Sequence, residues 1–403
     1  MDDMADKHTI QADKYIILGV TGSIAAYKTP DLVRRIRGDV FRGVRVVLTE
    51  AAGRFVAPLS LEVVSENPVL CDTFESPLAH IDLARDASAL LVAPATLNTV
   101  SNFAAALCPN LLTNLFMVFQ GPVLIAPAMN WRMYENPVFR DKLEYLKSRG
   151  VIEIPPEIGA LACGEEGRGR MASFDTIITY LRRALSQRDM AGMKVVVTGG
   201  PTREYIDSVR FITNRSSGKM GAALALAAHL RGADVTYITG PSSIAPTPGV
   251  EILEVATSRQ MQTAVMHACK GAHVLLMSAA VCDFTPEAAA DGKLERSGDL
   301  TLRLSATPDI VAGVAALTPR PFIAAFSAEY GADVERARMK RVKKGVDMMV
   351  FNDITAQGAG FDSDTNIVTI ITAEGEIALE KMSKFDVANA ILDKALHAGG
   401  RRV

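Results

Sequence analysis

The chain has 403 residues, too many for one ordinary domain, so two or three domains are expected. Its net charge of −2 argues against binding to nucleic acid or an anionic membrane, and no apolar run reaches the roughly 18 residues that span a bilayer. The polar start at residues 1–14 is a loose tail without signal-peptide character, and five cysteines without paired spacing are typical of a reducing compartment, so we expect a cytoplasmic protein.

The first part of the chain alternates apolar runs with amphipathic segments. Strands are expected at 15–20, 44–48, 90–93, 123–126 and 151–154, and helices before 37, after 97, over 138–149 and over 174–185. This alternation predicts a doubly wound, Rossmann-like α/β domain over residues 15–185, with a mainly parallel sheet. The Gly-rich segment 162–171 is expected to be a flexible flap. The polar residues that follow the strands mark the edge where such sheets bind ligands.

A polar linker at 186–192 precedes a second domain of the same class at 193–403. Its expected strands are 194–198, 235–239, 273–277, 300–304, 322–325, 347–350 and 367–371, and its expected helices are 220–231, 258–269, 309–316, 333–344 and 384–397. The segment 291–299 is polar and Gly-rich, which is typical of a mobile loop.

The segment of the second domain richest in candidate site residues is GGPTREYIDSVRFITNRSSGKMG, residues 199–221. Ser216, Ser217, Gly218 and Lys219 stand at the start of an expected helix, where unpaired N–H groups, hydroxyls and a cation suit a phosphate. A capped helix start with a solvated lysine stays open as the simpler interpretation. Neither GxxxxGK[ST] nor GxGxxG is present, which disfavours a P-loop enzyme and a Rossmann dehydrogenase.

Four positions carry possible chemistry in the first domain. Gly22-Ser23 could bind a phosphate or could simply cap a helix. His80 is suited to proton transfer, although a single histidine is more often a surface or core residue than a catalytic one. Asn130 ends an apolar strand at the ligand edge. Cys163 lies in the Gly-rich flap, where an exposed thiol could act as an acid or reductant.

Taken in chain order, these segments resemble a known family. GSIAAYK, His80 in HIDL, PAMN and ACGEEGRGRM are similar to motifs of flavin-dependent decarboxylases that act on cysteine carboxylates. GPTREYIDSVRFITNRSSGKMG, SAAVCDF, Lys293 and TPDI are similar to motifs of phosphopantothenate–cysteine ligase. Nearly the whole chain therefore resembles the bacterial bifunctional phosphopantothenoylcysteine decarboxylase/phosphopantothenate–cysteine ligase of coenzyme A biosynthesis.

For residues 15–185 the resemblance implies an FMN-dependent decarboxylase. FMN oxidises the cysteinyl end of the substrate to a thioaldehyde, CO₂ leaves, and the electrons return to the enethiol. His80 matches the active-site histidine, Asn130 the residue that holds the substrate carboxylate, and Cys163 the residue of the last protonation. The segments matching FMN contacts are Gly22, Ser23, Thr49, Pro94, Ala95, Thr96 and Asn98.

For residues 193–403 the resemblance implies a ligase that uses CTP, Mg²⁺, 4'-phosphopantothenate and L-cysteine through an acyl-cytidylate. Asn214 matches a residue of the second step, and Ser216 to Lys219 would lie near the substrate phosphate. Lys293 would neutralise charge on the transferred phosphoryl group, and the Mg²⁺ would accompany the nucleotide near Asp283. The remaining nucleotide contacts would be Ser305, Ala306, Thr307, Pro308, Phe326, Lys340 and Lys344.

The resemblance also implies a homo-oligomer assembled from trimers, often a dodecamer, with the flavin site between subunits. The chain departs from the family pattern at Asn102, Ala106, Pro109 and Glu295. Relatives often have a lysine, a glycine and an acidic residue at the first three of these positions and a lysine at the fourth, so Glu295 would weaken nucleotide binding. The alternative of a non-catalytic regulatory flavoprotein subunit is disfavoured because His80 and Cys163 are present.

Overall fold

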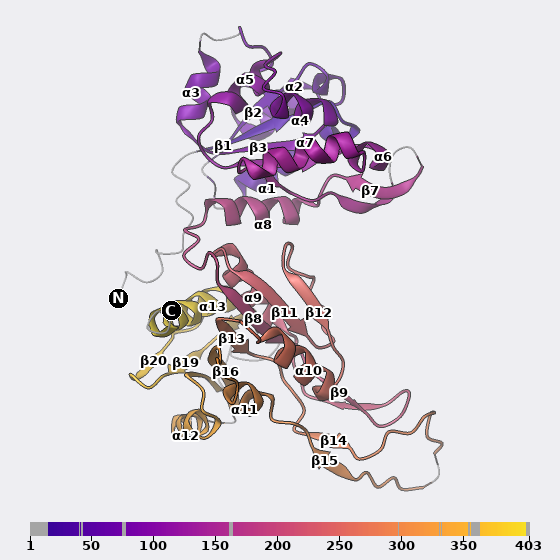
Figure 1. The fold of residues 1–403 in the computed structure, drawn as a ribbon, viewed down its shortest axis with the longest axis vertical. Helices are drawn as coiled ribbons and strands as arrows, with labels where there is room; N and C mark the ends of the chain where they lie inside the picture. The colour runs from indigo at the N-terminus through magenta and orange to yellow at the C-terminus, as the bar shows by residue number, and fades with distance from the viewer. Residues whose placement is uncertain are drawn as a thin grey trace. The chain divides into compact units, whose positions relative to one another are not determined.

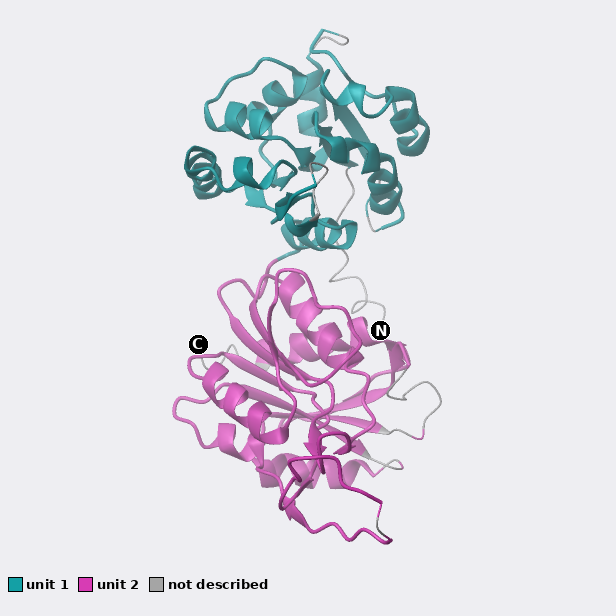
Figure 2. Cartoon of the chain, turned by 90° about the vertical axis from the view of Figure 1, so that its right-hand side faces the viewer, with its two compact units in different colours: residues 1–187 teal, residues 188–403 magenta. Residues whose placement is uncertain are grey.

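The chain divides into two compact units, residues 1–187 and 188–403 (Figures 1 and 2). The computed structural model describes residues 15–39, 41, 43–74, 78–160, 164–296, 298–329, 331, 333–353, 355 and 363–399. Among these residues, no helix combines the length and the apolar character needed to cross a bilayer. Each unit is built around its own large sheet.

The sheet of the first unit has five parallel strands in the order β2-β1-β3-β4-β5. They are β1 (Tyr15–Val20), β2 (Val44–Leu48), β3 (Ala87–Ala95), β4 (Val123–Pro127) and β5 (Ile152–Glu153). Nearly every residue of β1, β3 and β4 is buried, as parallel strands covered on both faces require. The strand order reverses between β1 and β3, so the loops after these strands diverge and leave a crevice.

Helices cover both faces of this sheet, which confirms the predicted fold class (Figure 1). One face packs against α1 (Thr29–Arg37), α2 (Pro58–Ser65) and α8 (Phe174–Leu185). The other packs against α3 (Ala79–Arg85), α4 (Leu97–Ala104), α5 (Leu111–Val118) and α7 (Pro137–Ser148). The shorter elements are η1 (Ile24–Lys28), η2 (Ala52–Arg54), α6 (Trp131–Tyr134) and the hairpin of β6 (Glu157–Ala160) with β7 (Glu166–Arg170).

The second unit has an eight-stranded sheet in the order β12-β11-β8-β13-β16-β17-β19-β20. Its strands are parallel except for β19 and β20, which pair antiparallel at one edge. They are β8 (Lys194–Gly199), β11 (Asp234–Thr239), β12 (Glu251–Glu254), β13 (Val274–Met277), β16 (Phe322–Glu329), β17 (Met348–Asp353), β19 (Val368–Ile371) and β20 (Glu376–Ala378). A mainly parallel sheet is thus confirmed here too.

Two helices pack on one face of the second sheet and three on the other. The first set is α9 (Lys219–Leu230) and α13 (Lys384–Gly399), and the second is α10 (Ser258–Ala268), α11 (Ile310–Ala315) and α12 (Val334–Lys344). The short strands β18 (Thr365–Asn366) and β21 (Met382–Ser383) pair beside α13.

Two small hairpins project from the second sheet, and we call residues 203–213 and 284–306 the arm (Figure 1). Its strands are β9 (Arg203–Tyr205) paired with β10 (Phe211–Thr213), and β14 (Phe284–Pro286) paired with β15 (Leu304–Ala306). The strand predicted at 300–304 is wrong over 300–303, because the alternating Leu300 and Leu302 are exposed and have no neighbouring strand of the sheet. Apolar alternation alone does not show what would cover a strand.

Ala106 adopts a left-handed backbone with φ 54°, in the connection between α4 and α5. This conformation costs an L-residue about 1–2 kcal/mol, whereas a glycine loses roughly 0.4–1 kcal/mol through its freer unfolded chain. We expect Ala106→Gly to raise the free energy of unfolding by up to ~1 kcal/mol, measurable as a higher melting temperature. Ala105→Gly is the matched control, because Ala105 has an ordinary φ of −97° and should lose stability. Equal destabilisation by both variants would contradict the assignment of strain to Ala106.

Candidate functional site

A cavity of about 1500 Å³ lies at the C-terminal edge of the first sheet. The loops after β1, β2, β3 and β4 all contribute to its lining. Six of the residues predicted for this domain line it, namely Gly22, Ser23, Thr49, Thr96, Asn98 and Asn130. Pro94 and Ala95 are buried in β3 and do not line it.

Thr21 joins the two central loops of this cavity. Its hydroxyl donates to the carbonyl of Pro94 at 2.8 Å and accepts from the backbone N–H of Thr96 at 3.0 Å. Thr96 then caps α4, because its hydroxyl accepts from the N–H of Thr99. Ser23 caps η1 in the same way through the N–H of Ala25. The loops after β1 and β3 are therefore fixed to each other with two helix starts facing the crevice.

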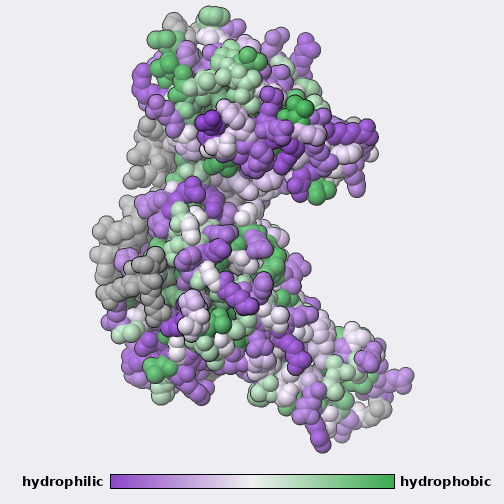
Figure 3. Space-filling model, viewed as in Figure 1, coloured by the Kyte–Doolittle hydropathy of each residue, from purple (hydrophilic) through white to green (hydrophobic). Residues whose placement is uncertain are grey.

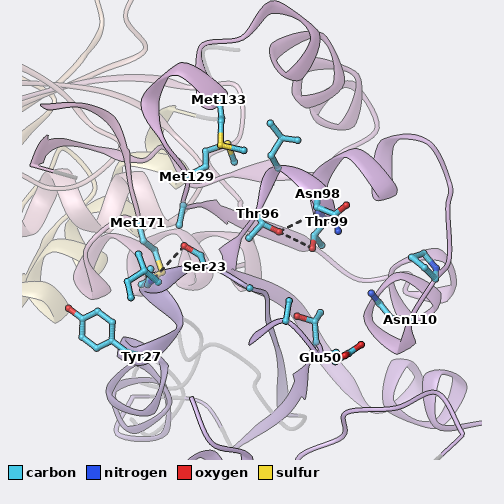
Figure 4. A pocket seen from close by; sticks show the side chains of 18 of the residues that line it. Ser23, Tyr27, Glu50, Thr96, Asn98, Thr99, Asn110, Met129, Met133 and Met171 are labelled. Carbon is cyan, nitrogen blue, oxygen red and sulfur yellow. Dashed lines mark hydrogen bonds between the residues drawn. The ribbon is translucent and has the colours of Figure 1, made fainter. Parts of the chain in front are cut away.

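The cavity has an apolar side and a polar side (Figure 4). The apolar side includes Tyr27, Met129, Met133 and Met171, and the polar side includes Glu50, Thr96, Asn98 and Asn110. Flavin mononucleotide combines a large ring system with a phosphate, and helix starts rich in hydroxyls suit the phosphate. The residues present therefore fit this cofactor, with room beside it for a substrate.

Asn130 is held from both ends of its amide. Its oxygen accepts from the N–H of Arg132 at 2.9 Å, and its nitrogen donates to Glu165 at 3.4 Å. Glu165 also accepts from the indole of Trp131 at 2.9 Å and from the guanidinium of Arg132 at 2.9 Å. One carboxylate thus fixes three consecutive residues, 130–132, beside the cavity.

Strand β7 lies directly on the turn formed by residues 129–131. The carbonyl of Gly169 accepts from the N–H of Met129 at 3.0 Å. A Cβ at Gly167 would lie 2.6 Å from the Cβ of Trp131, and one at Gly169 would lie 2.2 Å from the carbonyl oxygen of Met129. The expectation of a flexible flap is therefore wrong for 166–170, because the glycines of GRGR allow close packing against the turn.

The other two residues predicted for decarboxylation do not line this cavity. His80 is the second residue of α3, half-buried, and its Nδ1 is buried with no hydrogen-bond partner in the described part of the chain. Cys163 lies outside the described residues. Within one chain, the cavity thus includes Asn130 but not His80.

A second cavity, of about 830 Å³, lies at the C-terminal edge of the second sheet. It brings together residues predicted from widely separated motifs. These are Asn214, Ser216, Ser217, Gly218, Lys219, Asp283, Ala306, Thr307, Pro308, Phe326, Lys340 and Lys344. Lys340 and Lys344 lie one turn apart on α12 and both face it, so they are more than a solvated basic stripe.

Backbone and side-chain hydrogen bonds join these motifs. The amide nitrogen of Asn214 donates to the carbonyl of Val281 at 2.9 Å. Thr307 donates its hydroxyl to the carbonyl of Cys282 at 2.6 Å and its N–H to the carbonyl of Asp283 at 3.0 Å. The segments after β10, β13 and β15 are thereby fixed around one opening.

Carboxylates lie beside the cations of this second cavity. Lys219 contacts Asp364 at 2.6 Å, and this hydrogen bond holds the pKa of the Asp364 carboxyl below its ordinary value. Lys344 lies 3.5 Å from Asp309. Among the described residues, no group of three or more His, Cys, Asp and Glu could hold a metal ion. A Mg²⁺ here would depend on the phosphates of a nucleotide for most of its ligands.

Lys293 and Ser305 belong to the arm and do not line this cavity. Lys293 is exposed, in the segment between β14 and β15. Several lining residues were missed by sequence reasoning, namely Asn110, Arg170, Asp309, Asn352, Asn366 and Lys384. Asn110 and Asp309 cap α5 and α11, a signal that the sequence contained, whereas Lys384 has no local signal.

Comparison with known proteins matches both units. The Flavoprotein family matches residues 4–186, and the DNA/pantothenate metabolism flavoprotein C-terminal domain matches residues 190–398. The coenzyme A biosynthesis bifunctional protein CoaBC of Vibrio cholerae is 42% identical, over 94% of this chain and 97% of that protein. Its counterpart in Escherichia coli K12 is 39% identical over 95% and 97%, and that of Bacillus subtilis 39% over 95% and 96%.

Two solved structures each cover about half of this chain. A crystal structure of the C-terminal domain of CoaBC is 32% identical, covering 51% of this chain and 94% of that chain with a TM-score of 0.44. A PPC decarboxylase mutant complexed with pantothenoylaminoethenethiol is 32% identical, covering 42% and 96% with a TM-score of 0.38. The curated relatives align along nearly their whole length with nearly the whole of this chain, and the chain belongs to the family of bifunctional coenzyme A biosynthesis flavoproteins.

Proposed function

We propose that the chain catalyses two consecutive steps of coenzyme A biosynthesis. The first joins 4'-phosphopantothenate to L-cysteine at the expense of CTP, and the second decarboxylates the product to 4'-phosphopantetheine with FMN. The observation that carries this proposal is the alignment with bifunctional relatives across both units. A separate cavity at the sheet edge of each unit supports it, because reactions with different cofactors need separate sites.

In the ligase, the carboxylate of 4'-phosphopantothenate would attack the α-phosphorus of CTP and release pyrophosphate. The amine of cysteine would then attack the acyl carbon and release CMP. Ser216 to Lys219 would hold the substrate phosphate, and Asn214 would orient the second attack. Lys340 and Lys344 would neutralise the nucleotide phosphates, for which their place in the second cavity is the support.

In the decarboxylase, Asn130 would bind the substrate carboxylate through its amide nitrogen. Bound FMN would supply a two-electron oxidation of the thiol-bearing carbon and return the electrons after CO₂ has left. His80 would hold or move a proton during these steps, and Cys163 would return the last proton. Gly22, Ser23, Thr49, Thr96 and Asn98 would hold the cofactor.

A trimer with the flavin site between copies would bring His80 of one chain to the cavity of the next. The support is that His80 lies outside the lining of its own cavity, while apolar side chains of the first unit are exposed, including Phe74 at 91% and Leu78 at 63% beside α3. The arm also exposes apolar residues among polar ones, including Val209 and Phe284 (Figure 3). Two such surfaces suit a larger assembly such as a dodecamer.

We expect His80→Asn to abolish CO₂ release while leaving CTP-driven ligation intact, because the two sites belong to separate units. Purified wild-type protein should carry the visible absorption band of FMN. CO₂ release from supplied 4'-phosphopantothenoylcysteine, and pyrophosphate release from CTP, measure the two steps separately. Equal loss of both activities would mean that the substitution damages folding instead, and full CO₂ release would remove His80 from the mechanism.

A further inference from the structure

The turn between β9 and β10 is built around the buried carboxylate of Asp207, whose side chain is 0% exposed. One oxygen, Oδ1, accepts from the N–H of Val209 at 2.8 Å and of Arg210 at 2.6 Å. The backbone N–H of Ile206 also donates to the carbonyl of Arg210 at 2.8 Å. Oδ1 is therefore enough to close the turn locally.

The other oxygen reaches a distant part of the chain. Oδ2 accepts from the N–H of Leu294 at 3.1 Å, 87 residues away in sequence. The guanidinium of Arg210 lies 3.4 Å from Oδ2 and donates to the carbonyl of Leu294 at 2.6 Å. The carbonyl of Ile206, in the same turn, accepts from the backbone N–H of Ala290 at 3.0 Å. The turn thus forms hydrogen bonds with the segment between β14 and β15 at two positions, Ala290 and Leu294.

These two points bracket Lys293, which directly precedes Leu294. Within the described residues 287–303, no helix or strand holds the backbone. The turn between β9 and β10 is followed by β10, then by Asn214 and the Ser216–Lys219 segment at the start of α9, which line the second cavity. The backbone beside Lys293 is therefore tied to the rim of that cavity through this turn, and the Asp207 carboxylate makes one of the contacts. Desolvation acts to raise the pKa of the Asp207 carboxyl, but the three backbone N–H groups together with the charge of Arg210 outweigh it and leave this pKa lowered.

We propose that Asp207 is a positioning residue for nucleotide activation, which uses Oδ2 to fix the backbone beside Lys293 so that this ammonium group meets the transferred phosphoryl group. The inference rests on the proposed ligase function of Lys293. It assigns the two oxygens of one carboxylate separate duties. Oδ1 closes the turn and Oδ2 holds the loop.

This separation makes Asp207→Asn a selective variant. The amide oxygen can still accept the two N–H groups of the turn, but the amide nitrogen cannot accept from Leu294. We expect the first turnover of pyrophosphate release, measured with CTP, Mg²⁺ and 4'-phosphopantothenate without cysteine, to slow on the order of 10-fold or more, because small misplacements of a catalytic group are costly. The KM for CTP should change little, and CO₂ release should be unchanged.

A double-mutant cycle separates positioning from a merely structural role. Asp207→Asn should add no further loss in a Lys293→Gln background, because the loop then has no ammonium group to position. Asp291→Asn, the same chemical change on an exposed loop carboxylate, is the matched control and should behave as wild type. Should Asp207→Asn fail to fold, Leu294→Pro deletes the same hydrogen bond from the loop side.

A wild-type rate for Asp207→Asn, an additive loss in the double variant, or an effect on the KM for CTP alone would each overturn the assignment. If Lys293→Gln itself keeps full activity, the proposed ligase mechanism fails instead, so the two failures are distinguishable.

Discussion

Gly169→Ala is expected to eliminate most decarboxylation while leaving the ligase active. The new Cβ would lie 2.2 Å from the carbonyl oxygen of Met129 and 3.2 Å from the backbone nitrogen of Trp131, and backbone atoms cannot move aside cheaply. Strand β7 would lift from the turn and carry Glu165 away from Asn130. A misplacement of about 1 Å at a substrate-binding group lowers rates by on the order of 10²-fold.

The measurement is CO₂ release from supplied 4'-phosphopantothenoylcysteine, with pyrophosphate release as the internal control. Trp131 is the only tryptophan of the chain, so its fluorescence emission reports directly on the loss of the Glu165 contact. Gly159→Ala on the paired strand β6 is the matched variant, because its Cβ would meet no atom closer than 3.7 Å. If Gly169→Ala decarboxylates as fast as Gly159→Ala, the packing of β7 on the turn does not position Asn130.

Lys293→Gln should slow pyrophosphate release by on the order of 10²–10³-fold, because it removes a cation from the developing charge of phosphoryl transfer. The same assay run with each nucleoside triphosphate should show a preference for CTP, an expectation that rests on the family resemblance. In this chain Lys293 lies outside the lining of the second cavity. Its proposed role therefore requires the arm to approach a nucleotide in this chain's cavity or in that of a second copy.

Arg296→Gln is the control for Lys293, since it removes a cation of the same exposed segment three residues further on. It should retain most of the activity, and Glu295→Lys should tighten CTP binding by adding a cation to this segment. Undiminished activity of Lys293→Gln would overturn the catalytic role, and preference for ATP would overturn the base assignment. Mixing Lys293→Gln with Asn214→Asp tests the second-copy arrangement, because restored activity requires that subunits complement one another.

The sequence patterns predicted the buried strands but not the short helices α3 and α5. The strands β1, β4, β8 and β13 were predicted because parallel strands buried on both faces are continuous apolar runs. Helix α3 was missed because it begins after Leu78 in a left-handed conformation without a side-chain cap, so the sequence carries no start signal. Helix α5 did carry one, the capping box of Asn110 with Thr113, which sequence reasoning overlooked.

The sequence by itself determined the α/β class and the family, and most of the site residues that it predicts do line the two cavities, because the loops after parallel strands converge at one edge of a sheet. Only the tertiary structure showed which distant side chains hydrogen-bond to the site residues and to the segments beside them. Glu165 on Asn130 and Asp207 on Leu294 join positions 35 and 87 residues apart, and no local pattern specifies such pairs. The tertiary structure also placed His80 and Lys293 outside the cavities of their own chain, because that depends on how α3 and the arm pack.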